Sequence, residues 1–196
     1  MSISLSLKTW LFRYNNSTSW SNEELMLSYA ACGDQLLLSK LYDACGNDLY
    51  HFLITLSDPT LAKDISQLTW LKVMEKKHQY RDSGLFKAWL FTLARNLLID
   101  EYRRNQKFID DIDADTFVAP DLLSNKEHDR LQRFNLALEN LPFVQREAFC
   151  LQQEMFSLED IATITHNNIE TVKSRLRYAK DNLREQLKDL AEEQHV

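Results

Sequence analysis

Glycine and proline are scarce in this chain, with three of each among 196 residues. Sandwiches and barrels use Gly or Pro at many tight turns, so a turn-dense β architecture is excluded. The glycines at positions 33, 46 and 84 also lie too far apart to form a phosphate-binding loop. Because 44% of the residues are hydrophobic, the chain has enough apolar surface for one ordinary core or two small ones. We therefore expect an all-α protein.

The chain lacks the signals of export, of a membrane span and of a metal site. No apolar run approaches the roughly 20 residues that cross a bilayer, and residues 1–11 have neither a basic segment nor a cleavage site. Cys32, Cys45 and Cys150 form no CxxC pair, and the five histidines are scattered. We interpret the cysteines as reduced thiols used as small apolar residues rather than as a redox switch or metal ligands. The expectation is a cytoplasmic protein with no cofactor and no membrane insertion.

Negative charge is concentrated in residues 108–129, which hold seven carboxylates and one lysine. This stretch accounts for the whole net charge of −6, contains Pro120 and shows no helical period. We interpret it as an acidic linker between two small helical domains. The expected organisation is an unassigned N-terminal arm at 1–21, a first domain at 22–107, a linker at 108–128, a second domain at 129–190 and a tail at 191–196.

The first domain contains a helix with two stripes. It begins at Asp58-Pro59, an N-cap followed by a proline at the first helical position, and continues to about Lys77. The apolar stripe comprises Leu61, Ile65 and Leu68, and the mixed stripe comprises Asp64, Gln67, Leu71 and Met74. A second stripe indicates either a fully buried helix or a surface for a protein partner.

A basic segment with an aromatic residue, Tyr80, follows this helix. The next helix places Phe86 and Trp89 on its core side and Arg95 and Asn96 on or near the other side. Basic and aromatic groups together suit single-stranded nucleic acid, because cations follow phosphates while rings stack on exposed bases. Taken alone, the pattern favours the alternative, in which the aromatic residues are core and the arginines are solvated.

The second domain has the pattern of a helix-turn-helix. The sequence from Ser157 to Asp160 predicts a capped helix start, and a short turn then leads to Asn168, the expected cap of the last helix. Residues 171–188 carry a net charge of +4 and combine an apolar stripe with a basic one. The second helix of such a motif enters the major groove, where Arg and Lys donate to guanine. A solvated helix face on a small bundle is the alternative.

The order and spacing of these motifs resemble the extracytoplasmic-function (ECF) class of bacterial sigma factors. The first domain is similar to sigma region 2 in AKDISQLTWLKV at 62–73, FKAWLFTLARN at 86–96 and DEYRR at 100–104. The second is similar to region 4 in LENLP at 138–142, SLEDIA at 157–162 and TVKSRL at 171–176. The resemblance extends over about residues 22–190.

The resemblance implies a protein that is not an enzyme, binds core RNA polymerase and directs transcription initiation, including promoter melting. The clamp helices of the largest β-type polymerase subunit would contact Asp64, Ile65, Gln67 and Leu71. The unpaired −10 strand would contact Tyr80, Arg81, Arg95, Asn96, Arg103 and Arg104. The −35 duplex would contact Glu170, Thr171, Lys173, Ser174, Arg175, Arg177, Tyr178 and Lys180. The polymerase flap region and an anti-sigma factor are further implied partners, and the acidic linker would follow the RNA path of the polymerase.

Three residues depart from the pattern of the sigma-factor family. His166 and Asn167 replace a usual glycine and aliphatic residue in the turn, and Glu170 replaces a common glycine. We therefore expect altered packing under the turn and a carboxylate close to DNA.

Two other classes of protein are alternatives to a sigma factor. A dimeric helix-turn-helix regulator would explain only the second domain. A helical hydrolase or transferase would need a nucleophile–base or metal constellation, and the sequence shows none.

Overall fold

The computed structural model describes residues 20–81, 85–109 and 126–188, and every regular element in these ranges is helical. The all-α prediction is thus confirmed. The elements are α2 (Asn22–Cys32), α3 (Gln35–Leu56), α4 (Pro59–Lys76), the 3-10 helix η1 (Lys77–Gln79), α5 (Phe86–Ile109), α6 (Lys126–Glu139), α7 (Phe143–Gln153), α8 (Leu158–Thr165) and α9 (Ile169–Gln186). None of these helices combines the length and apolarity needed to cross a membrane.

Local capping explains where several of the helices begin. The Asp58 carboxylate accepts hydrogen bonds from the backbone N–H groups of Thr60 and Leu61 and begins α4, as expected. Ser157 begins α8 in a reciprocal capping box with Asp160, and Asn168 caps α9, both also as expected. Each such cap satisfies backbone donors that a helix start leaves without partners, and typically contributes about 1 kcal/mol.

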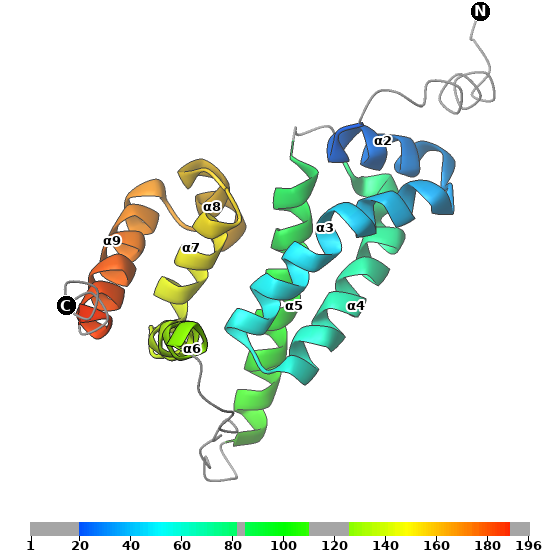
Figure 1. Ribbon diagram of the computed structural model, residues 1–196. Coiled ribbons are helices and arrows are strands. Elements are labelled where there is room, and N and C mark those ends of the chain that lie inside the picture. Colours follow the sequence, from blue (N-terminus) through cyan, green and yellow to red (C-terminus); the bar gives the residue numbers. More distant parts are fainter. Residues whose placement is uncertain (1–19, 82–84, 110–125, 189–196) are drawn as a thin grey trace, which may run out of the picture.

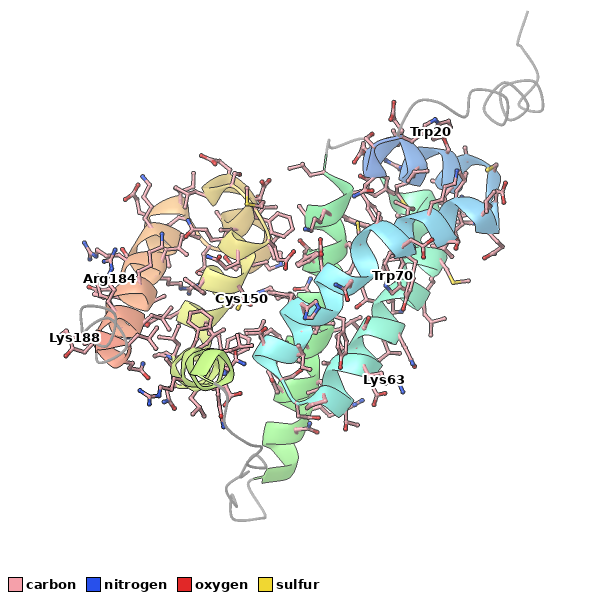
Figure 2. The ribbon with its side chains drawn as sticks, viewed as in Figure 1. Trp20, Lys63, Trp70, Cys150, Arg184 and Lys188 are labelled. Carbon is pink, nitrogen blue, oxygen red and sulfur yellow. The ribbon has the colours of Figure 1, made fainter. Side chains whose placement is uncertain are left out.

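Helices α2–α5 and α6–α9 form two groups that lie side by side (Figure 1). Most of their buried apolar side chains join in one cluster that extends across both groups. Two ring pairs cross the boundary, Phe91 with Phe156 at 5.0 Å and Tyr102 with Phe143 at 5.9 Å between centroids. Cys150 of α7 also lies between the groups (Figure 2), and its burial raises the pKa of the thiol to about 12. The two expected domains therefore pack against each other.

Helix α9 lies on the side of its group that faces away from α2–α5 (Figure 1). Its apolar stripe packs inward, with Val172 and Leu176 in the main cluster and Ala179 and Leu183 in a smaller one with α6. This packing leaves the basic side of α9 on the surface. Helix α5 extends to Ile109 and helix α6 begins at Lys126, so both enter the stretch 108–128 that we expected to be a linker. Residues 110–125 of that stretch, most of the arm and the tail at 191–196 lie outside the described residues.

Candidate functional site

The mixed stripe of α4 lies on the surface. Asp64, Gln67 and Met74 are exposed, and the Leu71 side chain is 57% exposed. The alternative of a fully buried helix is thereby excluded. A row of large apolar side chains flanked by polar ones on a surface helix is typical of a protein-binding site.

One residue of α4 lies on the other side from where its stripe placed it. Ile65 is 2% exposed and packs in the core, as its apolar stripe predicted, so in this conformation it is not presented for the polymerase contact that the family resemblance implied. Leu68, which we expected in the core stripe, is exposed. Leu68 lies four residues after Asp64 and three before Leu71, so helical spacing alone was sufficient to place it on the exposed stripe.

Tyr80 is buried rather than presented for stacking on a base. Its ring is 6% exposed and packs edge-on against Phe86 and Trp89, and its hydroxyl donates to Glu23 Oε2 at 2.6 Å. The prediction that Tyr80 stacks directly on an unpaired base is therefore wrong for this conformation. The neighbouring Arg81 is exposed.

Arg95 is committed to an ion pair between the two helix groups. Its Nε lies 2.7 Å from Glu147 Oε1 and its Nη2 lies 3.3 Å from Oε2. Glu147 is 0% exposed, and its burial raises the pKa of the carboxyl, although Arg95 and Arg175 act to lower it. Sequence analysis placed Arg95 on a nucleic-acid surface; in this arrangement it is not free to bind a strand.

The remaining residues expected at the −10 strand lie along α5. Asn96 is half-buried, whereas Arg103 and Arg104 are exposed and form ion pairs with Asp100 and Glu101 one turn earlier. Exposed pairs of this kind are weak and exchange readily for other anions. Arg103 and Arg104 are thus available to phosphates, and Asn96 is partly available.

A second set of ion pairs joins the two helix groups, and sequence analysis did not predict it. Lys87 Nζ lies 2.7 Å from Asp48 Oδ2 on α3 and 3.0 Å from Glu154 Oε2 after α7. Burial lowers the pKa of Lys87, but the hydrogen bonds and charges of the two carboxylates outweigh it and leave the pKa above its ordinary value. Nothing local in the sequence signals this group, because Glu154 lies 67 residues from Lys87.

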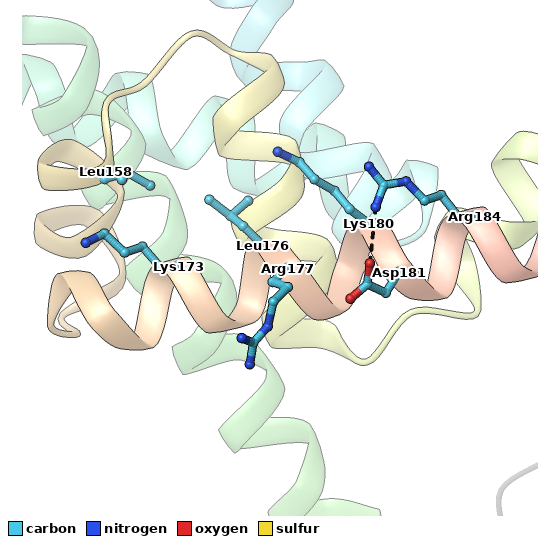
Figure 3. A pocket seen from close by; sticks show the side chains of 7 residues that line it. All are labelled: Leu158, Lys173, Leu176, Arg177, Lys180, Asp181 and Arg184. Atoms are coloured by element: carbon cyan, nitrogen blue, oxygen red, sulfur yellow. Dashed lines mark hydrogen bonds and ion pairs between the residues drawn. The ribbon is translucent and has the colours of Figure 1, made fainter.

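The basic stripe of α9 forms one surface. Figure 3 shows Lys173, Arg177, Lys180 and Arg184 along α9, beside Leu158 of α8, around a shallow groove. Arg184 is paired with Asp181 at 3.2 Å. This arrangement agrees with the expected side of the helix and places four cations where a phosphate backbone can approach them.

The N-terminal half of α9 presents most of the residues expected at the −35 duplex. Lys173, Ser174, Arg177 and Tyr178 are exposed, and Thr171 is half-buried. Glu170 is exposed as well and pairs with Lys173 at 2.8 Å. The carboxylate thus engages a neighbouring cation of the same helix turn.

Arg175 points back toward the turn. It is half-buried, its Nη2 donates to Asn167 Oδ1 at 3.2 Å, and its Nη1 is buried without a partner among the described residues. The prediction that Arg175 is a leading base-reading residue is therefore wrong for this conformation. Helical spacing alone did not reveal this, because the acceptor is the unusual Asn167 of the turn.

The turn itself accommodates its two unusual residues in different ways. His166 adopts the left-handed conformation with φ of 54°, at the position where the family resemblance led us to expect glycine. Asn167 replaces apolar packing with hydrogen bonds, since its backbone N–H donates to Ala162 O and its side-chain amide donates to Thr165 O. The turn is therefore held by polar contacts.

Comparison with known proteins identifies the first of the two predicted regions and relatives that match most of the chain. The family model for sigma-70 region 2 matches residues 41–108. The ECF RNA polymerase sigma factor EcfG of Rhodopseudomonas palustris is 35% identical over 67% of this chain and 75% of its own length. The ECF RNA polymerase sigma factor SigL of Mycobacterium tuberculosis is 32% identical over 84% of this chain and 96% of its own length.

Solved structures agree with these sequence relatives. The sigma factor RpoE of Bartonella quintana, solved in complex with the anti-sigma factor NepR, superimposes with a TM-score of 0.66 at 31% identity, covering 76% of this chain and 96% of that one. CnrH, solved in complex with the cytosolic domain of CnrY, has the same fold with a TM-score of 0.65 at 20% identity, covering 86% of this chain and 99% of that one. The chain therefore belongs to the extracytoplasmic-function class of RNA polymerase sigma factors.

Proposed function

We propose that this sigma factor binds core RNA polymerase through the exposed stripe of α4, captures the unpaired −10 strand along α5 and reads the −35 duplex with α9. Sigma factors are transcription initiation factors that direct RNA polymerase to promoters, and they are not enzymes. The observation that carries the proposal is the presence, on one chain, of an exposed partner stripe on α4 and an exposed basic stripe on α9.

The polymerase-binding surface consists of Asp64, Gln67, Leu68 and Leu71 in this proposal. Apolar side chains at its centre supply most of the binding energy on burial, and the polar rim sets orientation and specificity. Its occupant would be the clamp helices of the largest β-type subunit. Helix-on-helix contact suits a stripe at helical spacing.

The −35 surface consists of Lys173, Ser174, Arg177 and Tyr178, with Lys180 and Arg184 farther along the groove. The first four lie in the first three turns of α9, where a recognition helix reaches base edges. The cations farther along would contact phosphates and fix the register without reading sequence. Glu170 would limit what Lys173 can donate to, because the two side chains are paired.

Promoter melting and the remaining partners are also part of the proposal. Arg81, Asn96, Arg103 and Arg104 would hold the displaced −10 strand, with cations on phosphates. An anti-sigma factor is a reasonable further partner, because the related RpoE of Bartonella quintana was solved with one. Contact with the polymerase flap region and the role of the acidic linker stay predictions from the family resemblance.

Run-off transcription with core polymerase tests the proposal. Leu71→Asp places a charge at the centre of the α4 surface and should abolish promoter-dependent transcription and co-elution with core polymerase. Met155→Asp is the matched control, because Met155 is exposed, apolar and away from α4. If Leu71→Asp and Met155→Asp bind core polymerase equally well, the α4 assignment is incorrect. If the protein binds specific DNA sequences without polymerase and has no effect on run-off transcription, it is a free-standing regulator instead.

A further inference from the structure

Glu23, near the start of α2, contacts both described ends of the connection between η1 and α5. Its Oε2 accepts a hydrogen bond from Tyr80 Oη at 2.6 Å and another from the backbone N–H of Phe86 at 2.8 Å. Tyr80 directly follows η1, and Phe86 is the first residue of α5. One carboxylate oxygen therefore fixes the end of one element relative to the start of the next.

Both hydrogen bonds are of a strong kind. The N–H of Phe86 belongs to the first turn of α5, where backbone donors have no partner within the helix and the helix dipole attracts negative charge. The Tyr80 hydroxyl donates to an ionisable carboxyl at short range, and hydrogen bonds to a charged acceptor exceed neutral ones in strength. Edge-on packing of the Tyr80 ring on Trp89, at 5.0 Å between centroids, holds the hydroxyl toward Glu23.

This junction lies beside the residues that the proposed function assigns to the −10 strand. Arg81 directly follows Tyr80, and its guanidinium donates to the carbonyls of His78 and Tyr80. The orientation of Arg81 thus depends on where Tyr80 is held. A shift of Tyr80 away from Phe86 would change the distance between Arg81 and the DNA-facing side of α5.

We infer that Glu23 is a positioning residue for −10 strand capture. It acts through Tyr80 and the first turn of α5 and sets the geometry of the strand site in advance of binding. Tyr80 is then a support for this site instead of a stacking platform. The inference rests on the proposed function of α5, and it assigns to α2 a part in promoter opening. Preorganisation of this kind lowers the cost of ordering the site when the strand binds.

The experiment measures strand capture by holoenzyme. The probe is a pool of fork-junction duplexes that carry a fluorescent single-stranded −10 segment with randomised bases. Glu23→Ala should weaken capture by about fivefold to tenfold, as expected for the loss of hydrogen bonds to a charged group. Glu23→Gln should retain clearly more capture than Glu23→Ala, because its amide oxygen can still accept from both Tyr80 and Phe86, although as a neutral acceptor. Binding of a −35 duplex should be unchanged in both variants.

Two further variants separate positioning from stability. Tyr80→Phe keeps the ring and removes only the hydroxyl, so it should weaken capture, and combined with Glu23→Ala it should add little. Asp34→Ala removes the cap of α3, where Asp34 Oδ1 accepts from Leu36 N, and lowers stability at the opposite end of α2 from Glu23. If Asp34→Ala weakens capture as much as Glu23→Ala at an equal loss of thermal stability, the inference is overturned.

The strand-contacting variant Asn96→Ala distinguishes failure of the inference from failure of the proposed function. Weak capture by Asn96→Ala with normal capture by Glu23→Ala would overturn the role of Glu23 and leave α5 as the strand site. Normal capture by both variants would overturn the assignment of α5 and the inference with it. Weak capture by both, with rescue by Glu23→Gln, is the expected result.

Discussion

Glu147 is a single carboxylate whose burial makes stability depend on pH. Its folded pKa is raised above the ordinary 4.5, chiefly by burial, because the interaction with Arg95 only partly offsets the loss of solvent. A raised folded pKa means that the protonated carboxyl favours the folded state. This contribution is complete below the unfolded pKa and is lost as pH rises through the folded pKa.

We therefore predict that Glu147→Gln, which is neutral at every pH, loses this dependence. The free energy of unfolding of the wild type, minus that of the variant, should decrease as pH rises from about 4.5 through the folded pKa. Urea unfolding at several pH values measures this difference. The control is Glu159→Gln at an exposed site on α8. Parallel pH profiles for the wild type and Glu147→Gln would contradict the prediction.

His166 has a backbone conformation that costs free energy in a residue with a Cβ atom. Its φ of 54° lies in the left-handed region, which glycine adopts without the steric cost paid by a residue with Cβ. We predict that His166→Gly raises the free energy of unfolding by roughly 0.5–1 kcal/mol and that His166→Val lowers it. Thermal unfolding monitored by circular dichroism provides the measurement. Equal stabilities for the Gly and Val variants would show that this conformation is not retained in solution.

At the scale of elements, the sequence was sufficient to predict where several helices begin, but not the ion pairs between residues far apart in the chain. The starts of α4, α8 and α9 follow from caps within three residues of each start, so the sequence was sufficient to predict them. Which face of α4 packs inward was predicted only in part, since Ile65 lies in the core as its stripe predicted, whereas Leu68 of the same stripe is exposed. The Arg95–Glu147 pair joins residues 52 positions apart and has no signature in periodicity.

In helix α9, ion pairs between residues of the same helix should affect which DNA bases are preferred. Glu170 neutralises Lys173 at its N-terminal end, and Asp181 neutralises Arg184 farther along, in both cases with i, i+3 spacing. We predict that Glu170→Ala frees Lys173 and changes the preferred base at one −35 position by roughly 1 kcal/mol. The matched Asp181→Ala should raise affinity evenly for all sequences and steepen the salt dependence, because in the proposed function Arg184 contacts phosphates of the DNA backbone.

Selection from randomised −35 duplexes by holoenzyme at two salt concentrations measures both variants of α9. The two predictions differ in kind, since one concerns base preference and the other concerns affinity alone. If Glu170→Ala and Asp181→Ala select the same duplexes as the wild type, Lys173 does not read a base. A change of preference caused by Asp181→Ala alone would place the reading surface farther along α9.

At the scale of the whole molecule, the packing of the two helix groups occupies a cation that the family resemblance assigned to the −10 strand. Arg95 of α5 is bound to Glu147 of α7 across the boundary. Under the proposed function, α5 and α9 engage two different promoter elements, and we expect the two groups to separate when they do so. Separation would break the Arg95–Glu147 pair and release Arg95 toward the strand.

We predict that fluorescence transfer between dyes on α4 and at the end of α9 falls when the protein binds core polymerase and promoter. Lys63 and Lys188 lie on these two parts of the molecule (Figure 2), and both are exposed, so each can be replaced by cysteine for labelling. Cys32→Ser removes the exposed native thiol. Burial raises the pKa of Cys45 to about 11 and that of Cys150 to about 12, so neither forms the reactive thiolate at neutral pH.

The Lys87–Glu154 ion pair between the groups supplies the internal control for this measurement. Glu154→Gln removes the carboxylate that binds Lys87 across the boundary, so transfer in the free protein should already be lower than in the wild type. Glu159→Gln changes one exposed charge and should leave transfer unchanged. Transfer that stays constant on promoter binding, while transcription proceeds, would mean that the groups remain packed. Arg95 would then stay paired with Glu147, and the −10 strand would be held without it.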